Sequence, residues 1–238
     1  MFSIIKQVIK TKNEWGLKPL ILGAVYELFF LATHPRFKYF FVIEPQDLDI
    51  GKEDSELSDP YGPTPYWILT ISLKQIKKVI SDLRDSMFID IGCGPGRVLY
   101  CSSTVGFNRL IGVEQSKKLT DLCEQNLKRY LPSRVNSKIV NQNVKDINFT
   151  ELITELSHGS KTSSLVFFLY TPFKDKMLNI FLSKFDELNA YDCYIIFFGP
   201  QTENILTEKN FSVVYTHYVN KDTPIKIYFR GKTQYEDR

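Results

Sequence analysis

The chain has 238 residues and lacks the sequence features that mark several common classes of protein. Its net charge is only +3, so it has no basic footprint of the kind that nucleic-acid binding produces. Its four cysteines have neither metal-site nor redox spacing; they are Cys93, Cys101, Cys123 and Cys193. We therefore expect buried thiols in a reducing, cytoplasmic compartment, and a nucleic-acid partner is disfavoured.

Long apolar runs, repeats and low-complexity tracts are also missing. The apolar stretch from Leu20 to Ala32 is interrupted by Glu27 and is too short to cross a membrane. The segment Thr33-His34-Pro35 is a poor cleavage site, which argues against a signal peptide. Length and composition fit one main domain over residues 59–238, preceded by a helical extension and linker over residues 1–58.

The N-terminal extension has the pattern of two helices. Residues 1–12 place four apolar side chains on one face and lysines on the other; they are Ile4, Ile5, Val8 and Ile9. A second helix is predicted from Lys18 to about Thr33, and Glu44 to Ser58 is predicted to be a linker. These helices either cover the main domain as a lid or dimer surface, or attach the protein peripherally to a membrane or partner. A monomer and a homodimer both remain open.

The main domain alternates strand and helix patterns. Strands are predicted at 87–91, 110–114, 137–141, 164–170 and 192–198, with helices near 97–105, 116–129 and 174–189. A further helical pattern covers Trp67 to Leu83, and the chain ends in an antiparallel hairpin of 211–219 and 225–230. The predicted fold class is α/β: a mostly parallel seven-stranded sheet with a C-terminal antiparallel hairpin and helices on both faces.

A glycine-rich turn follows the first of these strands. Residues 88–96 form an apolar run that ends in Asp90, followed by Gly92, Gly94 and Gly96. Eighteen residues after Gly96, the next strand ends in Glu114. Glycine permits a sharp strand-to-helix turn and lets a ligand lie against the backbone amides, while a carboxylate at the next strand end can accept bonds from ribose hydroxyls. The pattern predicts a pocket for a nucleoside-bearing cofactor.

The details of this turn favour a cationic cofactor over a dinucleotide. A dinucleotide fingerprint needs glycine where this chain has Arg97, and Asp90 would repel a pyrophosphate. S-adenosylmethionine carries a sulfonium and an ammonium group, which a carboxylate attracts. We therefore predict S-adenosylmethionine as the cofactor and disfavour a nicotinamide-dependent oxidoreductase.

The segment 90–96 resembles motif I of the class I S-adenosylmethionine-dependent methyltransferases, and Glu114 matches their ribose-binding acid. The chain looks most like small bacterial members that share Pro63-Thr64-Pro65-Tyr66 and Tyr170-Thr171-Pro172-Phe173. The resemblance implies a Rossmann-like methyltransferase fold with a cofactor site built from Asp90, Gly92, Gly94, Gly96 and Glu114. It also implies that Thr64, Tyr66 and Trp67 help to wall this site.

The resemblance places two more residues at the adenine end. Asn143 stands where such enzymes often hold an acid that bonds the adenine amino group, and the backbone of Val144 would meet the ring. Asp146 is the alternative contact. The choice between Asn143 and Asp146 stays open at this point.

The acceptor side is less defined. Methyltransferases acting on amino nitrogen often have Asn or Asp before Pro-Pro and an aromatic residue, whereas this chain has Thr171 and a single proline. We take Tyr170, Thr171 and Phe173 as the candidate catalytic residues, and we find no convincing general base. The predicted function is methyl transfer to an unidentified acceptor: protein lysine, another amine or a small molecule. The alternative is a non-catalytic adaptor that holds a partner through its N-terminal helices.

Overall fold

The computed structural model describes residues 16–38, 47–51, 62–157, 159, 161–170, 175–199, 203–219 and 223–232. Three predictions lie wholly or mostly outside these residues: the amphipathic helix over 1–12, most of the linker over 44–58, and the roles of Thr171 and Phe173.

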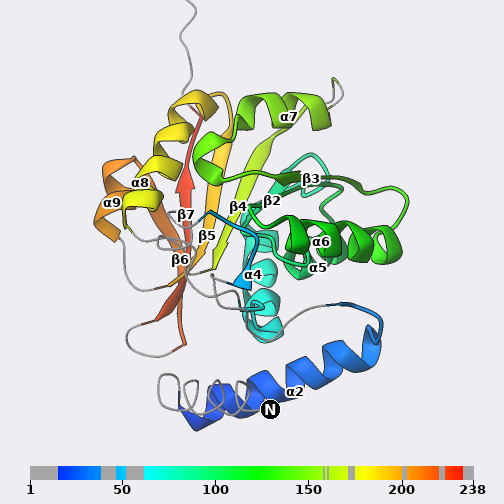
Figure 1. Ribbon diagram of the computed structural model, residues 1–238. Helices are drawn as coiled ribbons and strands as arrows, with labels where there is room; N and C mark the ends of the chain where they lie inside the picture. Colours follow the sequence, from blue (N-terminus) through cyan, green and yellow to red (C-terminus); the bar gives the residue numbers. More distant parts are fainter. Residues whose placement is uncertain are drawn as a thin grey trace, which may run out of the picture.

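A seven-stranded sheet forms the centre of the molecule, with the strand order β3-β2-β1-β4-β5-β7-β6 (Figure 1). The parallel strands are β1 (Met87–Ile91), β2 (Arg109–Glu114), β3 (Asn136–Asn141), β4 (Ser164–Tyr170) and β5 (Asp192–Phe198). At one edge, β7 (Pro224–Arg230) pairs antiparallel with β5 and with β6 (Ser212–Tyr218). The predicted fold class is confirmed, including the C-terminal hairpin.

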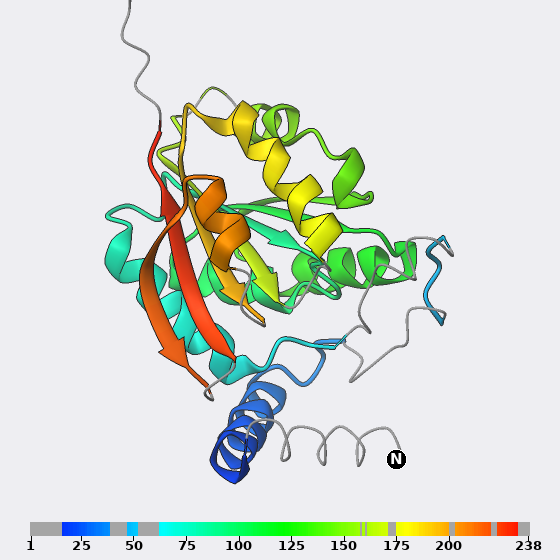
Figure 2. The same ribbon diagram turned by 90° about the vertical axis from the view of Figure 1, so that its left-hand side faces the viewer.

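Helices cover both faces of the sheet (Figures 1 and 2). One face holds α4 (Tyr66–Val79), α5 (Arg97–Val105) and α6 (Lys117–Tyr130). The other holds α7 (Phe149–Ser157), α8 (Asp175–Ser183) and the 3-10 helix η3 (Lys184–Leu188), with α9 (Glu203–Glu208) beside the hairpin. The sequence analysis predicted neither α7 nor α9. For α7 the signal was present, because Phe149, Leu152, Ile153 and Leu156 have helical spacing and are all buried.

The core divides into two layers that the sheet separates. Every residue of β1 and β2 is buried, as expected for central parallel strands covered on both faces. Phe167 and Phe181 belong to the layer under α7 and α8, while Phe88 and Leu99 belong to the layer under α4 and α5. This packing holds the loops at the carboxyl ends of the strands on a rigid base.

The helix α2 (Leu17–Thr33) lies outside these layers and packs on α4 (Figures 1 and 2). Its predicted start at Lys18 differs by one residue from the observed start. Phe30 is fully buried and its ring lies 5.1 Å from that of Tyr66 at the start of α4. Among the described residues, no helix combines the length and apolarity needed to span a bilayer.

Candidate functional site

The glycine turn lies between β1 and α5, next to the point where the strand order reverses from β1 to β4. Ligands of open α/β sheets bind in the crevice at such a point. Gly92, Gly94 and Gly96 all have positive φ, at 75°, 48° and 84°. The amides of Gly92 and Cys93 donate to the carbonyl oxygen of Val113 at 2.8 and 3.0 Å, which ties the turn to β2.

Two of the glycines serve different purposes. A Cβ atom at Gly92 would have no heavy atom within 4 Å among the described residues, so a ligand can approach the backbone there. A Cβ atom at Gly96 would lie 2.7 Å from Sγ of Cys123 on α6. Gly96 is therefore required for the close packing of the turn against α6.

Glu114 closes one side of the turn. Its side chain is buried; Oε2 accepts a hydrogen bond from the Gly94 amide at 3.0 Å and Oε1 accepts one from the Ser116 amide at 2.9 Å. Desolvation raises the pKa of Glu114, although these backbone donors act in the opposite direction. The carboxyl group expected to bind ribose is thus held against the turn.

Asp90 is the second acid of the site and lacks such partners. It is only 2 % exposed, and among the described residues its Oδ2 atom has no hydrogen-bond partner. Burial, and then the nearby charge of Glu114, raise the pKa of Asp90 well above its usual value. A buried carboxyl oxygen without a donor carries an energetic cost that a hydrogen-bonding cation would remove.

The loop after β3 approaches Glu114 from the other side. Asn143 caps the 3-10 helix η2 (Val144–Asp146) by accepting from the Lys145 amide, and its Nδ2 donates to Oε1 of Gln115 at 3.1 Å. Val144 is buried, whereas Asp146 is exposed. Asn143 therefore contacts the residue that follows Glu114, and Asp146 has no such contact among the described residues.

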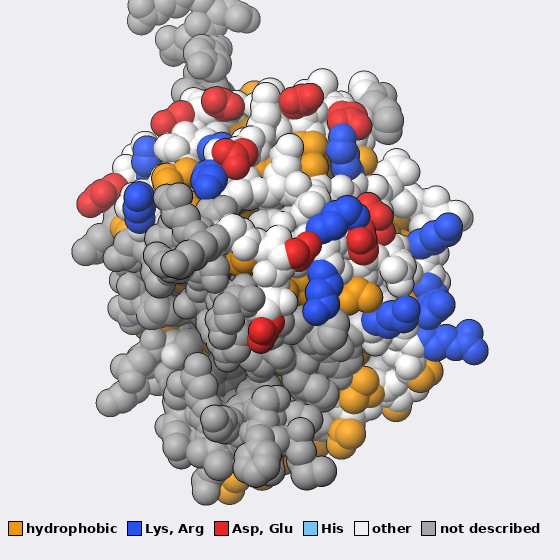
Figure 3. Space-filling view, in the orientation of Figure 1, with side chains coloured by type: hydrophobic (Ala, Val, Ile, Leu, Met, Phe, Trp, Pro, Cys, Tyr) orange, Lys and Arg blue, Asp and Glu red, His pale blue; other side chains and the backbone are white. Residues whose placement is uncertain are grey.

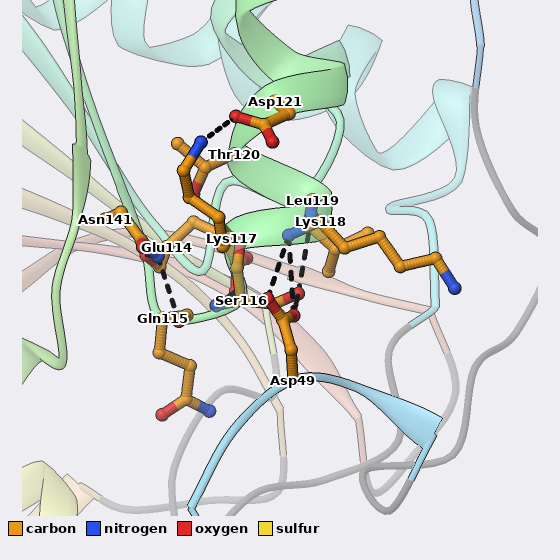
Figure 4. Close-up of polar contacts among 10 residues, drawn as sticks. All are labelled: Asp49, Glu114, Gln115, Ser116, Lys117, Lys118, Leu119, Thr120, Asp121 and Asn141. Atoms are coloured by element: carbon orange, nitrogen blue, oxygen red, sulfur yellow. Dashed lines mark hydrogen bonds and ion pairs between the residues drawn. The ribbon is translucent and has the colours of Figure 1, made fainter.

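A residue of the predicted linker reaches the same region (Figure 4). Asp49 accepts hydrogen bonds from the Ser116 hydroxyl and from the Lys118 amide, the latter at 3.2 Å from Oδ2. It thereby helps Ser116 to cap α6, directly after Glu114. This contact was not predicted, because nothing near Asp49 in the sequence indicates a partner 67 residues away.

Thr64 and Tyr66 lie where α2 meets the glycine turn. Arg97, the first residue of α5, donates from Nη1 to both carboxylate oxygens of Glu27 at 2.8 and 2.9 Å and to the Thr64 carbonyl at 3.3 Å. The Tyr66 amide donates to the same Glu27 carboxylate. Glu27, which the sequence analysis noted only as an interruption of an apolar run, joins three segments of the chain.

On the acceptor side, Tyr170 ends β4 and stacks on Phe198 with ring centroids 5.0 Å apart.

Two of the histidines lie within the described residues. Nε2 of His34 lies 2.6 Å from the Tyr100 hydroxyl, so this histidine joins the end of α2 to α5, and His217 is half-buried on β6. The described part of the chain contains no cluster of His, Cys, Asp or Glu suited to a metal ion. All four cysteines are buried, as predicted, and none of them forms a disulfide.

A sheet in this order, with a glycine turn after β1 and an acid at the end of β2, defines the Rossmann-like fold of class I methyltransferases. One solved structure with a TM-score above 0.5 has the same fold. The magnesium protoporphyrin IX methyltransferase of Synechocystis with bound S-adenosylmethionine aligns with a TM-score of 0.51 at 14% identity, covering 69% of this chain and 78% of that chain. An S-adenosylmethionine-dependent methyltransferase from Aquifex aeolicus aligns with a TM-score of 0.48 at 14% identity, covering 79% of this chain and 98% of that chain.

These similarities are at the level of the fold. No protein-family model matches the sequence, and no curated protein matches it. The methyltransferase fold that the sequence resemblance implied is therefore confirmed by structure.

Proposed function

We propose that the protein is an S-adenosylmethionine-dependent methyltransferase. The observation that carries the proposal is the buried Asp90 carboxyl group, whose Oδ2 atom has no hydrogen-bond partner among the described residues beside an open glycine turn. A dinucleotide would bring a diphosphate to two buried acids, whereas the amino-acid part of S-adenosylmethionine brings an ammonium group. The methyltransferase fold and the cofactor bound to the Synechocystis protein support the same choice.

The residues present fit this cofactor. Asp90 would accept from the ammonium group or a water bound to it, and the open backbone at Gly92 would lie against the amino-acid part. Glu114 would accept from the ribose hydroxyls in place of its present bond to the Gly94 amide. Asn143 and Val144 would hold the adenine ring, and Thr64 and Tyr66 would close the site from the α2 side.

The bound cofactor would supply an activated methyl group. This chain would then bind the acceptor, align its nucleophile with the methyl group and exclude water. Alignment of reacting groups can contribute roughly 7–11 kcal/mol to barrier reduction. The acceptor would approach the carboxyl end of β4, where Tyr170 lies, and we propose protein lysine, another amine or a small molecule as its class.

Two assays test the proposal. Calorimetric titration with S-adenosylmethionine should show binding that Glu114→Gln weakens by about ten- to a hundredfold, since hydrogen bonds to a charged group contribute roughly 1.5–3 kcal/mol. Glu124→Gln, on the exposed side of α6, is the matched control and should bind normally. Incubation of cell extract with radioactive methyl donor, followed by separation into protein, lipid and small-molecule fractions, should identify the acceptor class.

The outcomes separate the alternatives. Binding of S-adenosylmethionine without label transfer to any fraction would favour the non-catalytic adaptor. Binding of NAD in place of S-adenosylmethionine would contradict the proposal.

A further inference from the structure

Among the side chains of α2 that the structure describes, those that face away from the domain are apolar. Six large apolar side chains on this helix are 40–67 % exposed, and together they define its outer face: Leu17, Ile21, Leu22, Val25, Leu28 and Phe29. Residues at positions 17, 21, 25 and 28 share one side of a helix. In Figure 3 apolar side chains are visible mainly at the lower right edge of the molecule, where one end of α2 lies in Figure 1.

Among the described side chains, the outer face carries no polar group that would recognise a particular protein surface. The one acid of the helix, Glu27, points inward to Arg97. Every described side chain that is exposed between Leu17 and Ala32 is apolar. Protein interfaces usually have about one hydrogen bond per 100–200 Å² and a polar rim, whereas the interior of a bilayer needs neither.

Basic residues gather at one end of this face. Arg36 and Lys38 follow α2, Lys128 and Arg129 end α6, and all four are exposed. Arg129 donates to the Arg36 carbonyl at 3.4 Å, which places the two pairs together. We call these four residues the basic rim; in Figure 3 blue side chains gather at the right, next to the apolar edge.

The charge of the chain is distributed in the same way. Residues 1–38 contain six Lys or Arg and two Asp or Glu. The remaining 200 residues contain 24 Lys or Arg and 25 Asp or Glu. The excess positive charge of the protein therefore belongs to the segment that includes α2. A basic segment beside an apolar helix face is the combination that binds anionic lipid surfaces.

We propose that the outer face of α2 inserts into the surface of an anionic lipid bilayer, with the basic rim against the lipid headgroups. The contacts of Glu27 with Arg97 and with the Tyr66 amide fix α2 to the main domain. The domain that holds the glycine turn is thus attached to the bilayer as one body. This inference does not depend on the methyltransferase reaction.

Vesicle co-sedimentation of the full chain tests the proposal. The protein should pellet with phosphatidylcholine vesicles that contain a third of phosphatidylserine, and it should pellet less with phosphatidylcholine alone and at high salt. The double variant Val25→Asp with Leu28→Asp should lose about tenfold or more in partitioning, because each change removes apolar side-chain area from the lipid contact. Val213→Asp with Val214→Asp is the matched control, since both valines are exposed on β6 at the sheet edge.

A second pair of variants tests the charge. Arg36→Glu with Lys128→Glu should weaken partitioning to the anionic vesicles by about fivefold for each residue. Lys161→Glu with Lys176→Glu, which changes two exposed lysines outside the basic rim, should not. Melting curves and S-adenosylmethionine titrations of all variants show whether the fold and the cofactor site are intact. A failure of the membrane-binding proposal is thereby distinguished from a failure of the proposed function.

Three results would overturn the proposal. The first is wild-type protein that stays in the supernatant with anionic vesicles. The second is equal loss in the control variants. The third is a dimer, measured by light scattering, that Val25→Asp with Leu28→Asp dissociates while vesicle binding is absent; this result would assign the outer face to a second copy of the chain.

Discussion

Asp90 has an unusual environment for an aspartate in a folded protein. Its carboxyl group is buried, has an oxygen without a hydrogen-bond partner among the described residues, and lies near a second buried acid, Glu114. Its pKa is raised, so over the pH range between the unfolded and folded pKa values the folded protein binds a proton that the unfolded chain has released. Stability is therefore full below the unfolded pKa and falls as pH rises toward the folded one.

The first prediction concerns Asp90→Asn. Without cofactor, the variant should unfold at higher urea concentration than wild type at neutral pH, because it removes the cost of charging a buried carboxyl group. The difference should disappear below about pH 4, where both side chains are neutral. It should also lose most of the affinity for S-adenosylmethionine. Asp85→Asn, at an exposed position before β1, is the control. A stability difference that does not change with pH would contradict this account.

The second prediction separates the two kinds of glycine in the turn. Gly92→Ala and Gly96→Ala both force an alanine into positive φ, at a cost of roughly 1–2 kcal/mol. Gly96→Ala also meets Sγ of Cys123, which adds about 1–3 kcal/mol. Urea unfolding should therefore show that Gly96→Ala is less stable than Gly92→Ala. Gly92→Ala should lose cofactor binding although it is the less destabilised of the two variants.

Cys123→Ala provides the internal test of that prediction. It removes the atom that the new methyl group would meet, so Gly96→Ala should cost less in a Cys123→Ala background. A coupling of about 0.5–3 kcal/mol between the two positions is expected for atoms in contact. Additive effects would show that the Gly96 position is strained by its backbone angle alone.

Among the elements, α2 is joined to the main domain by a partly buried ion pair between Glu27 and Arg97. Arg97 is 5 % exposed and Glu27 is 26 % exposed, so their ion pair is largely shielded from water. Arg97 also lies 4.6 Å over the Phe30 ring, on the same helix as Glu27. Removing one partner of a buried pair takes away an interaction that offsets the desolvation of the other charge.

The third prediction follows for Glu27→Ala. The variant should be destabilised by about 3 kcal/mol, and the amides of residues 17–33 should exchange with deuterium faster than those of the sheet. Glu151→Ala, at an exposed position of α7, should leave both measurements unchanged. Unchanged exchange in α2 would mean that the aromatic contacts of Phe30 and Tyr66 hold the helix without the ion pair.

At the same scale, the sequence identifies elements better than it identifies their contacts. The bounds of α2 and of the five parallel strands were predicted to within a residue or so, because apolar periodicity and breakers such as Pro35 act locally. The ion pair of Glu27 joins residues 70 positions apart, and the Asp49 cap joins residues 67 apart. No local pattern encodes such pairs, so only the folded chain shows them.

For the whole molecule, the alternation of strands and helices was sufficient to predict the parallel sheet, and the unbroken final strands were sufficient to predict the hairpin. The glycine turn and Glu114 were found for the same reason, since their positions at strand ends follow from the strand pattern. That Asp90 has a carboxyl oxygen without a partner among the described residues could not be predicted, because it depends on what packs around the side chain. The acceptor side stays a prediction: Thr171 and the single proline depart from the pattern of amine methyltransferases, and Thr171 and Phe173 lie outside the described residues.

The fourth prediction concerns the stability of the whole protein. A ligand that binds only the folded state stabilises it by roughly 2.7 kcal/mol at a hundred times its dissociation constant. For a chain of this size, the melting temperature should then rise by about 5–10 °C with S-adenosylmethionine and with S-adenosylhomocysteine. The shift should be mostly absent in Glu114→Ala, and dialysis should reverse it. A melting curve that neither compound changes would contradict cofactor binding, because a ligand that binds only the folded state must stabilise it.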